Sequence, residues 1–377
     1  MKKIVLIPDS FKGTLSSEEI CGIMSEGVRK HFPDCEIVSI PVADGGEGSV
    51  QCFLNAVGGE RIAETVKNPY LEDMESFYGI LEDGETAVIE MASCAGLPFV
   101  ESRKNPLKTT TYGVGQLILA AARKGCKKII VGLGGSCTND GGCGAASALG
   151  VKFYDKYGNA FIPVGGTLND IVKIDVSERA EELEGIEIIT MCDIDNLMFG
   201  EQGAAYVFGP QKGADPKMVG ELDQGLRQLH RIMKEDLGID LADTPGGGAA
   251  GAMGAGMIAF LGSNLQMGIE TVLNTVEFEK VIEDADMIFT GEGKIDTQSL
   301  RGKVVIGVAR RAKLKNVPVT AIVGGAEEGI DAIYDMGVTA VFTINRLPQD
   351  FSVSCGKSRE NMRETVDNIL RFMKAMS

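Results

Sequence analysis

Tryptophan is absent from the 377-residue chain, and histidine occurs only twice, as His31 and His230. Each histidine stands beside charged residues in a segment with a helical pattern, so we expect both on the surface of helices. Two isolated histidines offer neither metal-ligand nor triad spacing. Acid–base chemistry should therefore fall to carboxylates. The lack of tryptophan, together with 49 glycines, favours an α/β enzyme with tight loops over a binding module with an aromatic platform.

No C-x-x-C pair occurs among the nine cysteines. Their odd number and scattered spacing argue against a disulfide framework and a zinc site, and indicate a reducing cytosol. The net charge of −16 disfavours nucleic acid and anionic membranes as partners. We therefore expect a cytoplasmic monomer or homodimer whose partners are small molecules.

Two motifs that commonly bind nucleotides are also missing. The pattern G-x-x-x-x-G-K-[ST] occurs nowhere, and G-x-G-x-x-G fails because Cys137 follows Gly132 and Gly134 at the third glycine position. The broken fingerprint disfavours an NAD(P)-dependent oxidoreductase, so any nucleotide site is of another kind. The apolar run at the N-terminus ends at Asp9, too early for a signal peptide. The uncharged stretch 244–269 is interpreted as a buried glycine-rich loop that leads into a helix, not as a membrane span.

Short β-branched runs, each followed by a turn and a helical pattern, predict an α/β fold. Strands over 4–7 and 36–42 flank a helix that begins near Ser16, where Glu19 completes a capping box. The pattern then changes at 61–92, where three strands and the turn Asp83-Gly84 indicate antiparallel pairing. Parallel-type strands, alternating with helices, follow at 128–131, 186–191, 287–290, 317–323 and 338–343.

These patterns predict two α/β domains. Residues 1–65 and 282–377 would form a Rossmann-like parallel domain that is discontinuous in sequence. Residues 66–281 would form an inserted mixed α/β domain.

Glycines and charged residues gather where the predicted strands end, and ligands bind at that edge of a parallel sheet. Such loops occur at 9–13, 44–48, 193–195, 291–296 and 324–325. Each loop alone could be an ordinary turn, because Gly and Asp are common turn residues. The five together point to one crevice.

Two glycine-rich loops, 132–142 and 246–248, could cradle phosphate, because glycine lets backbone N–H groups approach an anion. The alternative for the second loop is close helix packing. The residues expected to bind the nucleotide are Gly134, Gly135, Ser136, Thr138, Asn139, Gly247 and Gly248.

The segment 291–303 combines three cations with two acids. Phosphoryl transfer needs this mixture, since cations stabilise the transferring oxygens while carboxylates hold Mg²⁺ or accept a proton.

Several long strings resemble the bacterial glycerate kinase family of the type without a P-loop. They occur in the family's order and are PDSFKGTLSS, PVADGGEGS, GLGGSCTNDGGCG, CDIDNLMFGEQGAAYVFGPQKGA, PGGGAAGAMGAG and TGEGKIDTQSLRGK. The resemblance implies transfer of the γ-phosphate of ATP to D-glycerate with Mg²⁺, generally yielding 2-phosphoglycerate. It also implies an active-site cleft between the two α/β domains. The alternatives are 3-phosphoglycerate as product, a kinase for another small hydroxy acid, or a two-domain small-acid binding protein without catalysis.

Matching motif positions suggest roles for individual residues. Ser10, Phe11 and Lys12 are expected to bind substrate, with Lys12 on the glycerate carboxylate or the transferred phosphate. Asp44 and Glu47 are expected to hold substrate hydroxyls or metal.

The catalytic assignments fall on the acidic and basic loops. Asp193 is the first choice for general base and Asp296 the second. Lys294 and Arg301 are expected to stabilise the transition state beside Lys12. The expected metal ligands are Asp193, Asp195 and Glu292.

Overall fold

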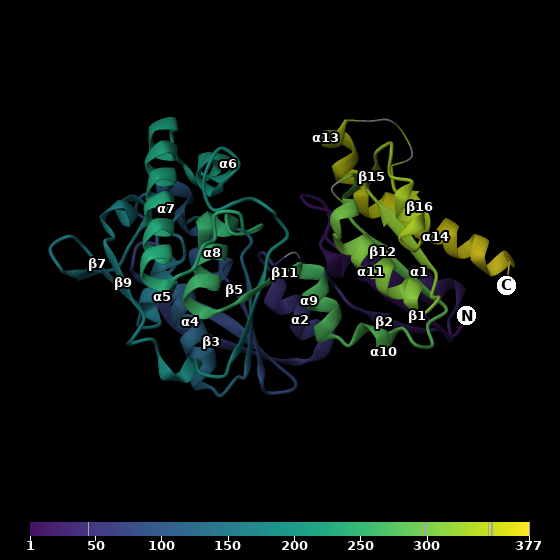
Figure 1. The fold of residues 1–377 in the computed structure, drawn as a ribbon. Helices are drawn as coiled ribbons and strands as arrows, with labels where there is room; N and C mark the ends of the chain where they lie inside the picture. The colour runs from purple at the N-terminus through teal and green to yellow at the C-terminus, as the bar shows by residue number, and fades with distance from the viewer. Residues whose placement is uncertain (44, 298, 346, 348–349, 377) are drawn as a thin grey trace. The chain divides into compact units, whose positions relative to one another are not determined.

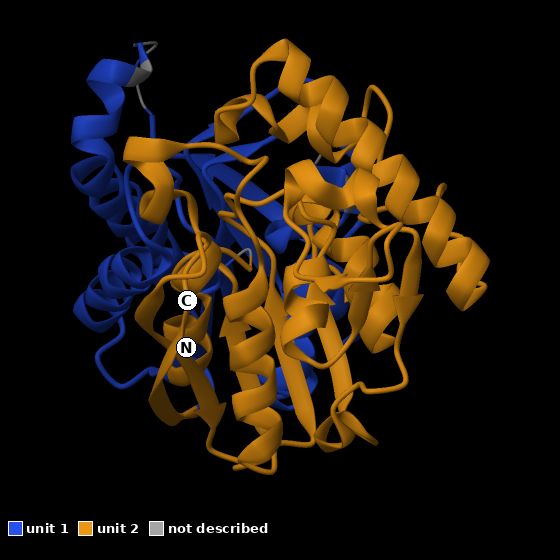
Figure 2. Ribbon diagram, turned by 90° about the vertical axis from the view of Figure 1, so that its left-hand side faces the viewer, with its two compact units in different colours: residues 1–43, 55–57, 269–377 blue, residues 44–54, 58–268 orange. Residues whose placement is uncertain are grey.

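The structure is a computed structural model that describes residues 1–43, 45–297, 299–345, 347 and 350–376. The chain divides into two compact units, which Figure 2 colours separately. Unit 1 consists of residues 1–43, 55–57 and 269–377, and unit 2 of residues 44–54 and 58–268. Both units combine helices with sheets, so the predicted α/β class is confirmed. No helix in the described ranges is long and apolar enough to cross a membrane.

Unit 1 is built on a parallel sheet with the strand order β16-β14-β12-β1-β2 (Figure 1). The first strand, KIVLIP, is buried from its second residue onward. Such continuous burial is typical of a parallel sheet covered on both faces. Beyond β2, residues 40 and 42 still donate hydrogen bonds to the carbonyls of residues 6 and 8, so extended backbone continues past the strand's end. The strands are β1 (Lys3–Pro8), β2 (Glu36–Ser39), β12 (Met287–Gly291), β14 (Val319–Val323) and β16 (Val338–Thr343), with the short pair β13 (Lys294–Ile295) and β15 (Gly325–Ala326).

Helix α1 of unit 1 begins where the sequence predicts. The Ser16 hydroxyl accepts a hydrogen bond from the Glu19 backbone N–H, and the Glu19 carboxylate accepts one from the Ser16 N–H. Gly27 lets α1 lie close to α14, since a Cβ atom there would lie 2.7 Å from Cγ1 of Val366. The helices are α1 (Ser17–His31), α9 (Gly268–Thr275), α10 (Phe278–Val281), α11 (Val304–Leu314), α12 (Ala332–Asp335), α13 (Phe351–Ser354) and α14 (Ser358–Met376), with 3₁₀ turns η5 (Ser299–Arg301) and η6 (Cys355–Lys357).

Unit 2 contains a mixed sheet with the strand order β11-β10-β6-β5-β4-β3. Strands β3 and β4 pair antiparallel along their whole length, which confirms the predicted change of pattern. Strands β5, β6, β10 and β11 are parallel to one another. The strands are β3 (Gly59–Lys67), β4 (Asp73–Leu81), β5 (Thr86–Glu90), β6 (Lys128–Gly132), β10 (Glu187–Met191) and β11 (Asn264–Gln266), and a second sheet is formed by β7 (Lys152–Tyr154), β8 (Ala160–Phe161) and β9 (Lys173–Asp175).

Two apolar cores stabilise unit 2. One packs α4 against the mixed sheet, and the other surrounds the long helix α7. The uncharged stretch forms a glycine turn and the buried helix α8, as the sequence predicts. The helices are α2 (Ser49–Val57), α3 (Ala92–Ala95), α4 (Tyr112–Arg123), α5 (Cys143–Ala148), α6 (Ala204–Phe208), α7 (Pro216–Leu237) and α8 (Ala249–Leu261), with 3₁₀ turns η1 (Leu97–Arg103), η2 (Gly165–Asp170), η3 (Glu181–Leu183) and η4 (Pro210–Lys212).

The unit boundaries differ from the predicted domain boundaries. Strand β3, which a boundary after residue 65 would cut, lies wholly in unit 2, and residues 269–281 lie in unit 1. The sheet of unit 1 takes β1 and β2 from the beginning of the chain and β12, β14 and β16 from the end.

Candidate active site

The carboxyl ends of two neighbouring strands define the candidate site in unit 1. From β1 the chain continues to β2 on one side, whereas β12, β14 and β16 follow one another on the other side. The connections therefore reverse direction between β1 and β12, and open α/β sheets bind ligands at such a reversal. Pro8 of β1 pairs with Gly291 of β12 there. The loops that follow these strands consequently start side by side, as the sequence predicts.

The loop after β1 carries the predicted substrate residues of unit 1. Asp9 donates its N–H to the Gly291 carbonyl at 2.8 Å, and its carboxylate accepts the Ser10 N–H at 2.6 Å. Phe11 is buried and anchors the loop, whereas Lys12 is exposed at the following turn. The structure thus holds Ser10 half-buried at the strand end and presents Lys12 to solvent.

Glu292, directly after β12, is a buried carboxyl group at the same edge. Only 4% of it is exposed, and its Oε1 atom has no hydrogen-bond partner in the described residues. Burial raises the pKa of Glu292 to about 7, opposed by a Ser299 hydrogen bond and the Lys303 charge and reinforced by Asp9 and Asp296. A carboxyl with this pKa can give or take a proton near neutrality.

The other predicted residues of this segment lie nearer the surface. Lys294 is exposed and forms an ion pair with Glu327, which raises the pKa of Lys294. The Asp296 carboxylate accepts the Ser299 N–H at 3.1 Å. Arg301 ends η5, and its side chain lies outside the described part of the structure. Lys294 therefore shares its charge with Glu327 at the surface.

In unit 2, the segment before α2 lies against the ends of β6 and β10. The Gly45 carbonyl accepts the Gly134 N–H at 2.9 Å, and a Cβ atom on Gly132 would lie 2.3 Å from that carbonyl. Only glycine allows this approach. Glu47 is exposed beside it, and Asp44 lies outside the described residues.

The loop after β6 packs against a buried lysine from η4 that sequence reasoning missed. Lys212 is 2% exposed, and its Nζ donates to Ser136 Oγ at 2.8 Å and to the Thr138 carbonyl at 2.7 Å. Burial lowers the pKa of Lys212 to about 8. Next to it, Oγ1 of Thr138 and both side-chain amide atoms of Asn139 are buried without a partner in the described chain. The structure therefore places Ser136 Oγ and the Thr138 carbonyl around a cation, in the same loop as Asn139.

Asp140 holds this loop in place. Its carboxylate accepts hydrogen bonds from the N–H groups of Thr111, Gly142 and Gly144 and from the hydroxyls of Thr110 and Thr111. Burial raises the pKa of Asp140, and the Thr111 N–H opposes that rise most. Its hydrogen-bonding capacity is spent within the protein, so Asp140 fixes the loop instead of contacting a ligand.

The other side of this loop is held by a left-handed turn inside α8. Ala250, Gly251 and Ala252 all have positive φ, which costs energy for the two alanines. A Cβ atom on Gly251 would lie 2.1 Å from the Thr138 carbonyl, and the Gly251 carbonyl accepts the Gly141 N–H at 3.0 Å. Strain of this kind is found at functional sites when the surroundings enforce it.

Gly247 and Gly248 are buried, and their N–H groups already have partners. Gly247 donates to the Thr244 carbonyl at 3.0 Å and Gly248 to the Asn196 carbonyl at 2.9 Å. A Cβ atom on Gly248 would lie 2.1 Å from the Leu197 carbonyl. Close packing, the alternative considered for this loop, accounts for these glycines.

Asp193 and Asp195 follow β10 and are both exposed. One Asp193 oxygen accepts the Gly268 N–H at 2.7 Å. The predicted metal ligands of unit 2 therefore face solvent. Among the described residues, no group of three or more His, Cys, Asp or Glu could hold a metal ion by itself.

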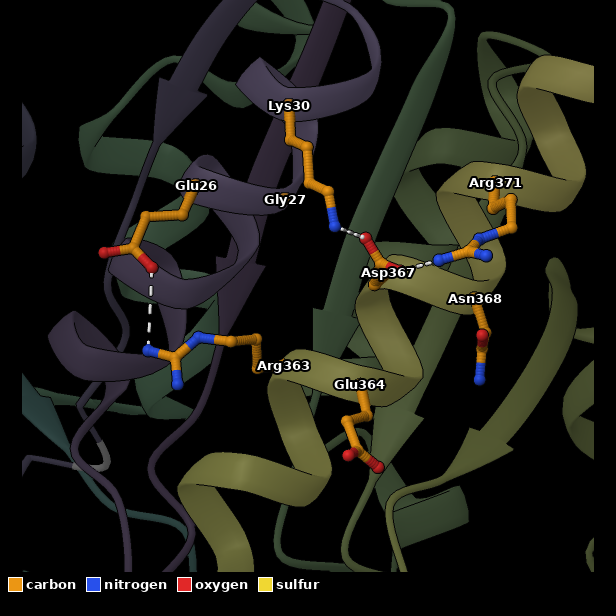
Figure 3. A pocket seen from close by; sticks show the side chains of 8 residues that line it. All are labelled: Glu26, Gly27, Lys30, Arg363, Glu364, Asp367, Asn368 and Arg371. Carbon is orange, nitrogen blue, oxygen red and sulfur yellow. Dashed lines mark hydrogen bonds and ion pairs between the residues drawn. The ribbon is translucent and has the colours of Figure 1, made fainter.

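A groove between α1 and α14 is lined by many charged side chains, but it includes none of the candidate-site loops described above (Figure 3). Its charges neutralise one another, since Glu26 pairs with Arg363 at 3.7 Å and Asp367 pairs with both Lys30 and Arg371 at 2.6 Å. It therefore has no charge left to select a ligand. The lining residues are Glu26, Gly27, Lys30, Arg363, Glu364, Asp367, Asn368 and Arg371.

Comparison with known proteins decides the family. The sequence profile of the glycerate kinase family matches residues 4–374. A glycerate kinase of Bacillus cereus is 46% identical over 376 residues, which cover 100% of this chain and 99% of that protein. This chain belongs to the glycerate kinase family. Escherichia coli glycerate 2-kinase is 43% identical over 98% of this chain and 95% of its own length. A crystal structure assigned to a glycerate kinase 2 of Salmonella typhimurium LT2 superimposes with a TM-score of 0.87 at 40% identity, covering 99% of this chain and 98% of that one.

For this member of the glycerate kinase family, sequence reasoning missed two buried charged residues, Lys212 and Glu90. Glu90 is 3% exposed at the end of β5, and its carboxylate accepts the Val50 N–H at 3.2 Å, at the start of α2. Burial raises the pKa of Glu90. The pattern at 86–92 places Glu90 inside a strand. Lys212 lies between Pro210 and Gly213, in a segment that has the composition of an ordinary turn. The only available signal was a charge in an otherwise apolar or glycine-rich string.

Proposed function

We propose that this chain transfers the γ-phosphoryl group of ATP to D-glycerate and releases 2-phosphoglycerate. The observation that carries the proposal is the match to the glycerate kinase family over nearly the whole chain. Phosphorylation at the 2-hydroxyl is supported by the name of the Escherichia coli relative, glycerate 2-kinase. The alternatives are 3-phosphoglycerate as product or another small hydroxy acid as substrate.

Glycerate carries a carboxylate and two hydroxyls, and the proposal gives each a partner. Lys12 would bind the carboxylate or the incoming phosphate, with Ser10 and Phe11 fixing the loop at the reversal point of the unit 1 sheet. Asp44 and Glu47 would hold hydroxyls. The loop that contains Gly134, Gly135 and Ser136 would bind the phosphates of ATP through backbone N–H groups.

Mg²⁺ would be held by carboxylates together with the phosphates of ATP. Magnesium usually takes one or two protein carboxylates and keeps several waters, so a complete protein cluster is not needed. Glu292 has an unpartnered buried oxygen, and Asp9 and Asp296 lie near enough to raise its pKa, which gives a donor set of the right chemistry. Asp193 and Asp195 are the second proposed pair of ligands. When bound, the ion would neutralise charge that develops on the phosphate oxygens.

Asp193 is our first candidate for the base that accepts the proton of the substrate hydroxyl, and Asp296 is the second. A kinase base needs no raised pKa, because it chiefly orients the hydroxyl. Lys12, Lys294 and Arg301 would stabilise the transferring phosphoryl group. Water must be kept from the reacting phosphate, since an open site would hydrolyse ATP.

A cytoplasmic location is also part of the proposal. All nine cysteines are free in the structure, and seven of them are buried. Free buried thiols are typical of proteins from reducing compartments.

The proposed activity can be tested by incubating purified protein with ATP, Mg²⁺ and D-glycerate and resolving the products by ³¹P NMR. We expect a phosphomonoester signal that requires D-glycerate and matches 2-phosphoglycerate. A signal matching 3-phosphoglycerate would correct the position of transfer. Intact ATP and no product would refute glycerate as the substrate, and a panel of small hydroxy acids would follow. Turnover of any of these acids would still separate a kinase from a binding protein.

The base assignment predicts the behaviour of Asp193→Asn. The amide keeps the size of the side chain but cannot accept the proton, so we expect kcat to fall at least about a hundredfold with the fold intact. Asp243→Asn is the matched control, because Asp243 is an exposed residue of unit 2 in a turn before α8. Near-normal turnover of Asp193→Asn would transfer the role to Asp296.

A further inference from the structure

The strongest feature not used so far is the buried cation beneath the loop after β6. Lys212 is almost fully enclosed, yet its Nζ donates to two neutral oxygens, Ser136 Oγ and the Thr138 carbonyl. Burying a lysine without a hydrogen-bonded carboxylate is costly, and such lysines are rare. The nearest acid that affects it, Asp140, spends its oxygens on five other donors. The site therefore carries positive charge that is not matched by a direct ion pair.

The contact with Lys212 fixes the direction of the Ser136 hydroxyl. Ser136 Oγ accepts a hydrogen bond from Lys212 Nζ, so the Ser136 O–H must point to a different acceptor. The described residues provide no such acceptor for this hydroxyl. Ser136 is 7% exposed, and Gly135 before it is exposed with φ of 75°. The serine thus has a donor to offer at the exposed tip of a glycine loop, with a cation directly behind it.

Further unpaired groups lie in the same loop. Thr138 Oγ1 and the two side-chain amide atoms of Asn139 are fully buried and have no partner in the part of the chain that the structure describes. Native proteins rarely leave three such atoms together, because each costs a lost hydrogen bond. Their presence marks a polar site that is completed by something other than this chain, whether a ligand or the water that comes with it.

The backbone around Lys212 is built to hold it there. Lys212 ends the turn η4, where its N–H donates to the Gly209 carbonyl at 3.0 Å. Gly213 follows with φ of 94°, and a Cβ atom on it would lie 2.7 Å from Cβ of Lys104. The backbone turn that places Lys212 in the interior therefore requires glycine at position 213.

We propose that Lys212 is a positioning residue for the phosphates of a nucleoside polyphosphate, holding the Ser136 hydroxyl toward the anion and supplying the charge behind it. The inference rests on the proposed function only in taking ATP as the donor. A phosphate chain suits the site better than a carboxylate, because the exposed Gly135, with φ of 75°, lets the backbone approach a multiply charged anion beside the Ser136 hydroxyl.

Binding should depend on the protonation of Lys212. Burial lowers its pKa to about 8, so a rise in pH through that value removes the charge that attracts phosphate. The titratable groups that act on Lys212 are Cys137 and Asp140. Burial raises the pKa of both groups, that of Cys137 to about 12. If the affinity for ATP falls between pH 7 and 9.5 in the wild-type protein but not in the Lys212 variants, the fall is due to Lys212.

The test is isothermal titration of the full-length protein with ATP, ADP, adenosine and D-glycerate between pH 7 and 9.5. We expect Lys212→Met to weaken the binding of ATP at least about tenfold, since one charge-assisted contact to phosphate is lost. The binding of adenosine, which has no phosphate, should change little. Lys212→Arg should restore much of the affinity and keep it at pH 9.5, where the wild-type protein loses it. Lys217→Met, which removes an exposed lysine of α7, should change nothing.

A second variant protects the test against misfolding. Ser136→Ala keeps Lys212 and should lower the affinity for ATP several-fold, while the affinity for adenosine stays unchanged. Unchanged ATP affinity in Lys212→Met or Ser136→Ala would overturn the inference, as would a loss confined to D-glycerate, which would make the site a carboxylate site. If the wild-type protein phosphorylates D-glycerate while Lys212→Met binds ATP normally, only this inference fails. A wild-type protein that binds no ATP would overturn both this inference and the proposed function.

Discussion

At the scale of single residues, the structure separates charged groups that a sequence treats alike. Lys294 and Lys212 are both lysines in glycine-containing segments. Lys294 is exposed and paired with Glu327, so water and the partner screen its charge. Lys212 is buried against neutral oxygens, where the same charge acts over a longer distance. Buried charged residues such as Lys212 are therefore the first choice for mutation, although the surrounding sequence does not predict that they are buried.

Glu292 gives a prediction that depends on pH. Burial raises its pKa from 4.5 to about 7, so the folded protein binds a proton that the unfolded chain releases at lower pH. Glu292 thus contributes stability that is fully present below pH 4.5 and is lost as pH rises through about 7. Glu292→Gln removes this loss. In EDTA, the unfolding free energy of the variant relative to wild type should therefore grow with pH, by on the order of 3 kcal/mol in all.

Urea unfolding at pH 5, 6, 7 and 8 would measure this difference, with Glu328→Gln as the control. Glu328 is an exposed glutamate of the same unit, so its substitution controls for the loss of one carboxylate. Glu292→Gln should also lose at least about tenfold in kcat, since the amide can neither hold Mg²⁺ as a carboxylate does nor take a proton. A stability difference that does not vary with pH would show that Glu292 does not titrate in this range.

At the scale of helices and strands, local rules predicted what local interactions decide. The capping box at Ser16 is formed as predicted, because it involves two residues three apart. The antiparallel pair β3 and β4 follows from the turn signals that bound it. The strand predicted over 36–42 ends at Ser39, because the chain beyond it keeps its extended form but makes only single bonds to β1.

Features that depend on distant parts of the chain could not be predicted in this way. The left-handed turn at Ala250 has no sequence signature, because contacts with Thr138 and Gly141 impose it from more than a hundred residues away. The burial of Lys212 likewise depends on a loop 76 residues earlier. The positions of the loops at the strand ends were predictable, since parallel strands share an edge, but the partners within those loops were not.

At the scale of the whole molecule, the two units differ in how they are encoded. The two apolar cores of unit 2 draw every buried residue from between residues 66 and 257, or between 143 and 260. The core of unit 1 combines residues 4–28 with residues 289–370, from the two ends of the chain. Unit 2 is therefore nearly continuous in sequence, whereas unit 1 cannot be made from one segment.

This arrangement predicts that a fragment of residues 44–268 folds on its own. It holds all six strands of the mixed sheet and both apolar cores. We expect a cooperative thermal transition by circular dichroism and a dispersed ¹H–¹⁵N NMR spectrum. The informative comparison is the fragment 66–281, whose ends are the domain boundaries predicted from the sequence.

The fragment 66–281 should fare worse for two reasons. It lacks residues 59–65 of β3, so β4 loses most of its antiparallel partner and becomes an exposed edge strand. It also carries residues 269–281, including Ile269, Leu273 and Phe278, which are buried in the full chain and belong to unit 1. Both changes favour aggregation, so we expect this fragment to be insoluble or to unfold without a sharp transition. Equal stability of the two fragments would mean that β3 adds little to unit 2, and that the boundary lies where the sequence pattern changes and not where the strand pairing begins.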